Sequence, residues 1–138
     1  MKIHRKELTE KEFKAALKKI PLNNIKLALV LGYYQCMRVS EVADLDMEDI
    51  DLSNGYIIIR SKMSREIPIL TVTRPLLKYM PVGVGVRSIQ YWLARVLPSH
   101  TFEGLRIAGL KHHIEQGKLS IGDFFKLSGT KKIWVGEK

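Results

Sequence analysis

The chain has 138 residues, of which 46% are hydrophobic and 27% are charged, a composition typical of one globular domain and not of a disordered segment. Its single cysteine, Cys36, excludes a disulfide framework and a multi-cysteine zinc site. Its apolar runs are too short to span a bilayer, and its first residues lack the apolar region of a secretory signal. We therefore expect a soluble, cytoplasmic protein that does not enter a membrane.

The net charge is +9, from 23 Lys and Arg against 14 Asp and Glu. The charge is distributed unevenly, because residues 41–51 contain six acidic residues and no basic one. A basic body with one acidic segment favours a polyanionic partner, most simply nucleic acid. The charge alone is also compatible with a basic, solvated surface that has no partner.

The first third of the chain has the periodicity of helices. Helices are expected over residues 10–19, 23–37 and 41–45, with N-caps at Thr9, at Asn23 or Asn24, and at Ser40. Thr9 and Glu12 have the spacing of a capping box, and Pro21 ends the first helix because it lacks a backbone N–H.

The period changes after the turn residues 51–55. The β-branched and aromatic residues 56–60 predict a strand, and residues 67–70 predict a returning strand at a sheet edge, because Pro68 cannot donate to a ladder. Further helices are expected over residues 72–80, 86–97, 102–116 and 120–127. Without a convincing linker, the pattern predicts one α+β domain, mostly helical, with a small antiparallel β-sheet.

Two segments of the chain carry a family resemblance. Residues 32–45, GYYQCMRVSEVADL, and the acidic turn that follows them resemble the first conserved box of the tyrosine recombinases, the phage integrase family. Residues 57–69, IIIRSKMSREIPI, resemble the hairpin of that family, and Lys62 follows Arg38 by 24 residues, as the family pattern expects. Its second box maps onto residues 103–107, EGLRI. The resemblance covers nearly the whole chain and implies the fold of the recombinase catalytic domain.

The resemblance also implies a function, the cleavage and rejoining of double-stranded DNA by transesterification through a phosphotyrosine, without metal or cofactor. Arg38 and Arg106 would clamp the scissile phosphate with planar, charge-assisted hydrogen bonds. Lys62 would protonate the departing 5′ hydroxyl, and Glu41 would orient Arg38 from three residues away. Arg65 is expected to belong to the general basic surface and to contact the DNA backbone.

The sequence departs from the family pattern in the second box and beyond it. Glu103 and Ile107 stand where the family has histidines, so Glu103 is either a catalytic residue or a charge that complements the helix N-terminus. His100 and Trp134 are candidates for the missing later-box residues, with a loop histidine and a packing anchor as the alternatives. No tyrosine follows Tyr91, so the expected nucleophile is absent from the sequence.

We therefore expect residues 1–138 to form one catalytic-like domain, without the N-terminal core-binding domain and without the C-terminal nucleophile segment. This chain is expected to be inactive alone and monomeric, whereas the intact enzyme would act as a tetramer on DNA in the nucleoid of a prokaryote, archaeon or virus. One alternative is a degenerate homologue that binds DNA or regulates without cleaving it. A further alternative is a protein-interaction module that docks through its acidic segment.

Overall fold

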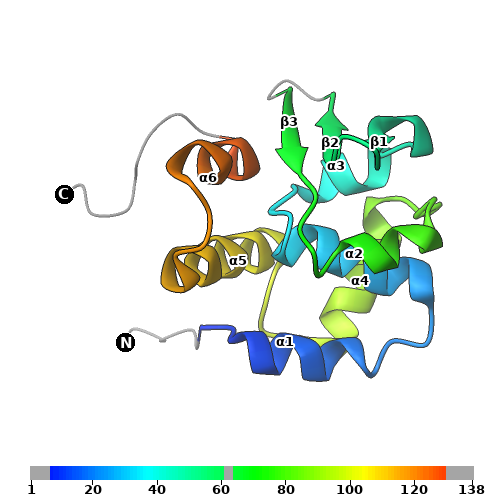
Figure 1. The fold of residues 1–138 in the computed structure, drawn as a ribbon. Coiled ribbons are helices and arrows are strands. Elements are labelled where there is room, and N and C mark those ends of the chain that lie inside the picture. Colours follow the sequence, from blue (N-terminus) through cyan, green and yellow to red (C-terminus); the bar gives the residue numbers. More distant parts are fainter. Residues whose placement is uncertain (1–6, 61–63, 130–138) are drawn as a thin grey trace.

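The computed structural model describes residues 7–60 and 64–129, and Figure 1 shows how their elements are arranged. The α-helices of this part of the chain are α1 (Glu10–Leu17), α2 (Asn23–Tyr33), α3 (Val39–Asp44), α4 (Val86–Val96), α5 (Phe102–Gln116) and α6 (Ile121–Ser128). Its 3-10 helices are η1 (Met47–Asp49) and η2 (Arg74–Tyr79). Its strands are β1 (Ile50–Asp51), β2 (Tyr56–Ile59) and β3 (Arg65–Pro68).

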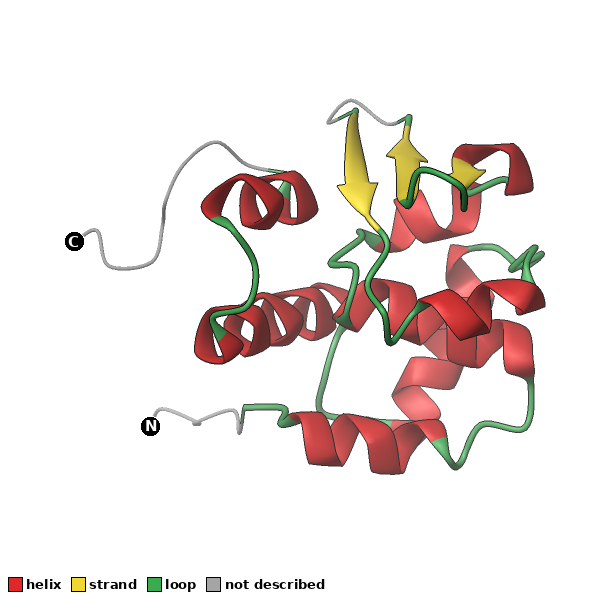
Figure 2. Cartoon of the chain, in the orientation of Figure 1, coloured by secondary structure: helices red, strands yellow, loops and turns green. Residues whose placement is uncertain are grey.

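A small sheet lies at one edge of the molecule, and helices make up most of the rest (Figure 2). Helices α2 and α5 pack against each other in the middle, with α1 along one side and the sheet on the opposite side. Helix α6 packs against β3. The expected α+β class, mostly helical with a small antiparallel sheet, is confirmed. Within the described ranges, no helix is both long enough and apolar enough to cross a membrane.

The sheet is antiparallel, with the strand order β1-β2-β3. Ile57 of β2 pairs with Ile50 on one side and with Ile67 on the other. Pro68 lies in the edge strand β3, as its missing donor requires. This strand begins and ends two residues earlier than expected, because its pairing with β2 runs from Arg65 opposite Ile59 to Pro68 opposite Tyr56. Beyond the strand, the N–H of Leu70 bonds to the side chain of Gln35.

Side-chain hydroxyls cap three helices, and the cap expected at Thr9 is confirmed. The Thr9 hydroxyl accepts from the N–H of Glu12 at 3.2 Å, while the Glu12 carboxylate accepts from the N–H of Thr9 at 3.0 Å. Thr101 caps α5 and Ser120 caps α6, each by accepting a backbone N–H three residues on. These side chains decide where α1, α5 and α6 begin.

The caps expected for α2 and α3 are wrong, for a tertiary reason at α2 and a local one at α3. Leu22 is the N-cap of α2, and the Asn24 amide instead donates to the carbonyl of Val82, far away in sequence. Arg38, and not Ser40, is the N-cap of α3, because the carboxylate of Glu41 accepts from the backbone N–H of Arg38 at 2.9 Å.

Two further expectations need correction. Helix α2 ends at Tyr33, short of residue 37, because Cys36 has a positive φ of 58° that a helix cannot include. The helix expected over residues 72–80 is the shorter 3-10 helix η2, with Pro75 in its first turn.

The closest approach of the two central helices occurs at Gly109. A Cβ atom at this position would overlap the carbonyl oxygen of Tyr33, so α5 reaches the end of α2 only because residue 109 has no side chain. One turn further along α5, the Nε2 atom of buried His113 donates to the carbonyl oxygen of Tyr34 at 2.7 Å. The glycine and the histidine together fix α5 against the last turn of α2.

We predict that Gly109→Ala lowers the free energy of unfolding by about 3 kcal/mol, because the new methyl group forces the two helices apart. Urea denaturation followed by circular dichroism measures this loss. The control is Gly122→Ala in α6, where the nearest atom to a new Cβ is 3.9 Å away; this variant should be as stable as the wild type or up to about 1 kcal/mol more stable. Equal stability of the two variants would contradict the close contact.

Burial lowers the pKa of His113 below its ordinary value of 6.5, although the hydrogen bond to Tyr34 opposes this shift. The unfolded chain therefore binds a proton at His113 more readily, so the folded state should lose stability as the pH falls below about 6.5. Urea midpoints compared at about pH 7.5 and pH 5.5 measure this loss. His113→Gln, which can still donate to Tyr34, should show a smaller loss, and an identical pH dependence of the two proteins would contradict the assignment.

Candidate functional site

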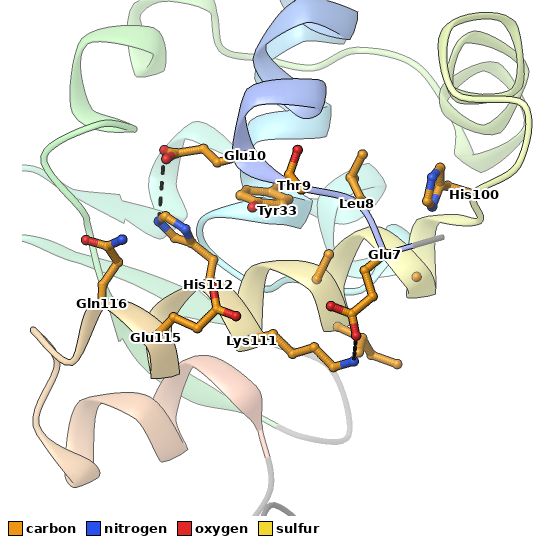
Figure 3. A pocket seen from close by; sticks show the side chains of 13 residues that line it. Glu7, Leu8, Thr9, Glu10, Tyr33, His100, Lys111, His112, Glu115 and Gln116 are labelled. Atoms are coloured by element: carbon orange, nitrogen blue, oxygen red, sulfur yellow. Dashed lines mark hydrogen bonds and ion pairs between the residues drawn. The ribbon is translucent and has the colours of Figure 1, made fainter. Parts of the chain in front are cut away.

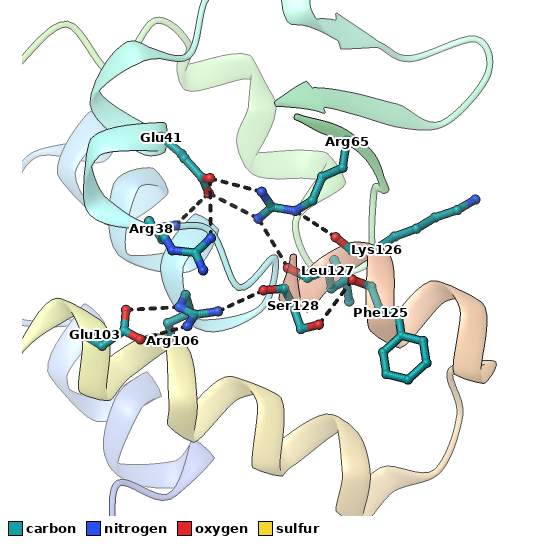
Figure 4. A network of polar contacts seen from close by, with 9 residues as sticks. All are labelled: Arg38, Glu41, Arg65, Glu103, Arg106, Phe125, Lys126, Leu127 and Ser128. Atoms are coloured by element: carbon teal, nitrogen blue, oxygen red, sulfur yellow. Dashed lines mark hydrogen bonds and ion pairs between the residues drawn. The ribbon is translucent and has the colours of Figure 1, made fainter. Parts of the chain in front are cut away.

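Three arginines converge beside the first turns of α5 (Figure 4). Arg38 caps α3, Arg65 begins β3 and Arg106 lies on α5. We call these residues, together with Glu41 and Glu103, the arginine cluster. Arg38 follows the end of α2 by five residues, so α2 brings it to the cluster. Arg106 reaches the cluster on α5, three residues before the contact of the two helices at Gly109.

Arg106 is the more buried of the two arginines that the resemblance assigns to phosphate binding. Its side chain is 9% exposed and donates to both carboxylate oxygens of Glu103, from Nε at 3.1 Å and from Nη2 at 2.7 Å. Its Nη1 atom donates to the carbonyl oxygen of Ser128 at 3.1 Å. Burial alone would lower the pKa of Arg106, but the hydrogen bonds and charge of Glu103 outweigh it and raise this pKa. Arg106 is therefore fully charged at neutral pH.

Glu41 is the buried anion of the arginine cluster, with a side chain only 2% exposed. Its two oxygens accept from Nη1 and Nη2 of Arg65 at 3.0 and 3.1 Å. Its Oε2 atom lies 3.6 Å from Nη1 of Arg38, whose backbone N–H it also binds through Oε1. Glu41 does lie beside Arg38, as expected, but its stronger side-chain partner is Arg65.

The expectation that Arg65 belongs to the general basic surface is wrong. Its side chain is 9% exposed, and besides Glu41 it binds the carbonyl oxygens of Lys126 and Leu127 at 2.8 and 3.4 Å. Arg65 thus joins β3 to the end of α6. A signal for this position exists in the sequence, because side chains two apart in a strand share a face and Ile67 is apolar and buried.

Arg38 is the arginine of the cluster with the most available donors. Its side chain is 35% exposed, so one part of it faces solvent. Its Nη1 atom is buried and has no hydrogen-bond partner within residues 7–60 and 64–129. Nη1 forms an ion pair with Oε2 of Glu41 at 3.6 Å, which is too long for a hydrogen bond. The charge of Arg38 is therefore only partly compensated, and the exposed part of its guanidinium is available to an anion.

Three expected site residues remain, and the structure describes one of them, His100. Lys62 and Trp134 lie outside the described residues. His100 lines a cavity of about 510 Å³ between the segment before α1 and the other side of α5 (Figure 3). Glu7 and Lys111 form an ion pair of 2.9 Å at the edge of this cavity. His100 thus lies on the cavity side and is not part of the arginine cluster, as its alternative interpretation as a loop histidine expects.

Comparison with known proteins identifies the family. Residues 6–96 match the family model described as the phage integrase family. The chain belongs to the phage integrase family. A curated relative, the tyrosine recombinase XerA of Pyrococcus furiosus, is 34% identical over 74 residues, which are 52% of this chain and 26% of XerA.

Solved structures of integrases share the fold. The integrase of mycobacterium phage Brujita superimposes with a TM-score of 0.80 at 15% identity, covering 96% of this chain and 52% of that one. A lambda integrase tetramer bound to a Holliday junction gives a TM-score of 0.71 at 18% identity, covering 100% of this chain and 50% of that one. The chain thus spans about a quarter of its curated relative and about half of these solved integrases.

The later-box histidine of the family is expected near residues 128–130, and this chain has no histidine there. Ser128 and Gly129 stand there, followed by Thr130. Gly129 has a positive φ of 71° and closes α6, and a Cβ atom on it would lie 2.9 Å from Cζ of Arg65. The guanidinium of Arg65 therefore fills the space beside the position where the family resemblance expects an imidazole.

We predict that Glu41→Gln lowers the free energy of unfolding by about 3 to 5 kcal/mol, because it leaves the buried charge of Arg65 without its anion. Chemical denaturation measures the loss. Glu7→Gln is a matched control, since it removes the carboxylate of the exposed pair with Lys111 and should cost less than about 1 kcal/mol. Similar losses in the two variants would contradict a structural role for Glu41.

Proposed function

We propose that this chain is the DNA-binding catalytic portion of a site-specific tyrosine recombinase, and that Arg38 and Arg106 hold the phosphodiester that is cleaved. The observation that carries the proposal is their convergence in the arginine cluster, in which the side chain of Arg38 is 35% exposed and is paired with Glu41 only at 3.6 Å. The lambda integrase whose fold this chain shares was solved on a Holliday junction. Family membership and the basic charge also support double-stranded DNA as the partner.

The charge of the arginine cluster suits one phosphodiester. Its three guanidiniums face two carboxylates, those of Glu41 and Glu103, which leaves an excess of one positive charge. A phosphodiester carries one negative charge and gains a second as a nucleophile adds to phosphorus. Guanidiniums fixed in advance stabilise that developing charge without reorganisation, which is the main catalytic effect available here.

The reaction that fits this geometry is a transesterification in two steps. A tyrosine oxygen would attack phosphorus, and the 5′ oxygen would leave with a proton from Lys62, which lies between β2 and β3 in the sequence. A 5′ hydroxyl would then attack the phosphotyrosine and restore the DNA backbone. We do not assign the nucleophile to Tyr33, Tyr34 or Tyr91, because Tyr33 and Tyr34 are buried around α1 and Tyr91 lies on the exposed side of α4.

We further propose that residues 1–138 act as one domain and that the whole recombinase assembles as a tetramer on DNA. The described residues share one hydrophobic core, to which α1, α2, α5 and the sheet all contribute, and this supports a single unit. The lambda integrase on the Holliday junction is a tetramer, which supports the assembly. The isolated chain is proposed to be a monomer.

A second candidate is a family member that binds DNA without cleaving it. The bidentate pair between Glu103 and Arg106 favours this candidate, because it occupies an arginine fork that a phosphate would need. The replacement of both second-box histidines by Glu103 and Ile107 is consistent with it. Both candidates require that Arg38 contacts a phosphate, and they differ in whether any form of the protein becomes covalently linked to DNA.

We predict that the chain binds a fluorescent DNA duplex and that Arg38→Ala weakens this binding about tenfold at about 50 mM salt, because one charge-assisted phosphate contact is lost. Fluorescence anisotropy over a salt series should also show the slope of log K against log salt falling by about one. Lys111→Ala is the matched control, since it removes the same charge from the cavity side of α5. Salt-independent binding, or equal affinity of the wild type and Arg38→Ala, would contradict the proposal.

A further inference from the structure

Glu103 and Arg106 differ sharply in their access to solvent. Both oxygens of the Glu103 carboxylate accept from Arg106, yet the Glu103 side chain is 56% exposed while that of Arg106 is 9% exposed. The opposite edge of the Arg106 guanidinium, at Nη1, is bonded to the carbonyl oxygen of Ser128 inside the protein. The exposed carboxylate of Glu103 therefore covers the Nε and Nη2 edge of Arg106, which Ser128 does not bind.

Several contacts hold the carboxylate in this place. Glu103 and Arg106 are three residues apart on α5, so their side chains lie on neighbouring positions of one helix face. Glu103 also lies in the first turn of α5, where the helix dipole favours a negative charge. The hydrogen bond from Arg106 lowers the pKa of Glu103, and the charge of Arg38 lowers this pKa further, so Glu103 stays ionised at neutral pH.

We propose that Glu103 is an affinity-determining residue that competes with DNA phosphate for the guanidinium of Arg106. A carboxylate and a phosphodiester use the same paired N–H donors of an arginine, so Arg106 cannot offer its Nε and Nη2 atoms to both at once. The exposure of Glu103 allows its carboxylate to turn out to solvent when a phosphate arrives. This inference rests on the proposed function of the arginine cluster.

If the contact between Glu103 and Arg106 instead positions Arg106, the expected change in DNA affinity has the opposite sign. If Glu103 served to hold Arg106 in its binding orientation, its removal would weaken DNA binding. The contact with Ser128 and the burial of Arg106 argue that the orientation is kept without Glu103, because both act on the part of the guanidinium that faces the interior. The sign of the change in affinity therefore separates competition from positioning.

The test compares Glu103→Gln with the wild type in fluorescence anisotropy on a labelled DNA duplex. We expect the affinity to rise about threefold to tenfold at low salt, and the slope of log K against log salt to become steeper by about one phosphate contact. Glu7→Gln is the matched control, because it raises the net charge by the same amount at an exposed ion pair on the cavity side of α5. Its affinity should rise less than twofold by the same measurement.

A second comparison ties the effect to Arg106. In an Arg106→Lys background, which keeps the charge but removes the fork of paired donors, Glu103→Gln should give a clearly smaller gain. Thermal unfolding of each variant confirms that the folded protein is being compared.

Three results would overturn the proposal: a lower affinity of Glu103→Gln, an equal gain in Glu7→Gln, or a gain that persists in the Arg106→Lys background. Binding that appears only in Glu103→Gln would support it. The absence of DNA binding by the wild type and every variant would overturn the proposed function itself, and so is distinguishable from a failure of the competition alone.

Discussion

The candidate site depends on one close contact between two helices. Where α5 passes the last turn of α2, Gly109 allows the two backbones to approach until a side chain would no longer fit. The buried hydrogen bond of His113 to Tyr34 holds the same crossing one turn away. Because Arg106 precedes this crossing on α5, and Arg38 follows the end of α2, the crossing determines the distance between the two arginines. The core is therefore packed in a way that serves the surface chemistry.

Charge inside the cluster is balanced in layers. Glu41 is the most buried group of the cluster, and Arg65 neutralises its charge. Arg65 also donates to two backbone carbonyl oxygens at the end of α6. Arg38 lies further out and is only partly satisfied by Glu41. Glu103 is the outermost group and the most exposed. The structural ion pair is thus buried, where its loss is costly, and the groups proposed to exchange partners lie where water can reach them.

Sequence reasoning succeeded where a few neighbouring residues decide the structure. Thr9 predicts its helix start because its capping partner is three residues away. It failed for Arg65, whose partners are 24 and 61 residues distant. The two-residue spacing from Ile67 indicates the face of the strand on which Arg65 lies, but it does not identify these partners. The family resemblance placed Arg38 and Arg106 in one site, and it could not reveal the Glu103 pair because that contact is a departure from the family pattern.

Gly129 packs against Arg65, so substitutions at these two positions affect each other. An imidazole at residue 129 would require both a different backbone conformation and the withdrawal of the guanidinium that now lies beside it. That withdrawal would also release Glu41 and loosen the end of α6 from the sheet. A single substitution of Gly129 is therefore expected to lower the stability of the fold, even where the new side chain could take part in catalysis. A side chain at residue 129 is therefore tolerated only if residue 65 is changed with it, so the two positions are coupled through the stability of the fold.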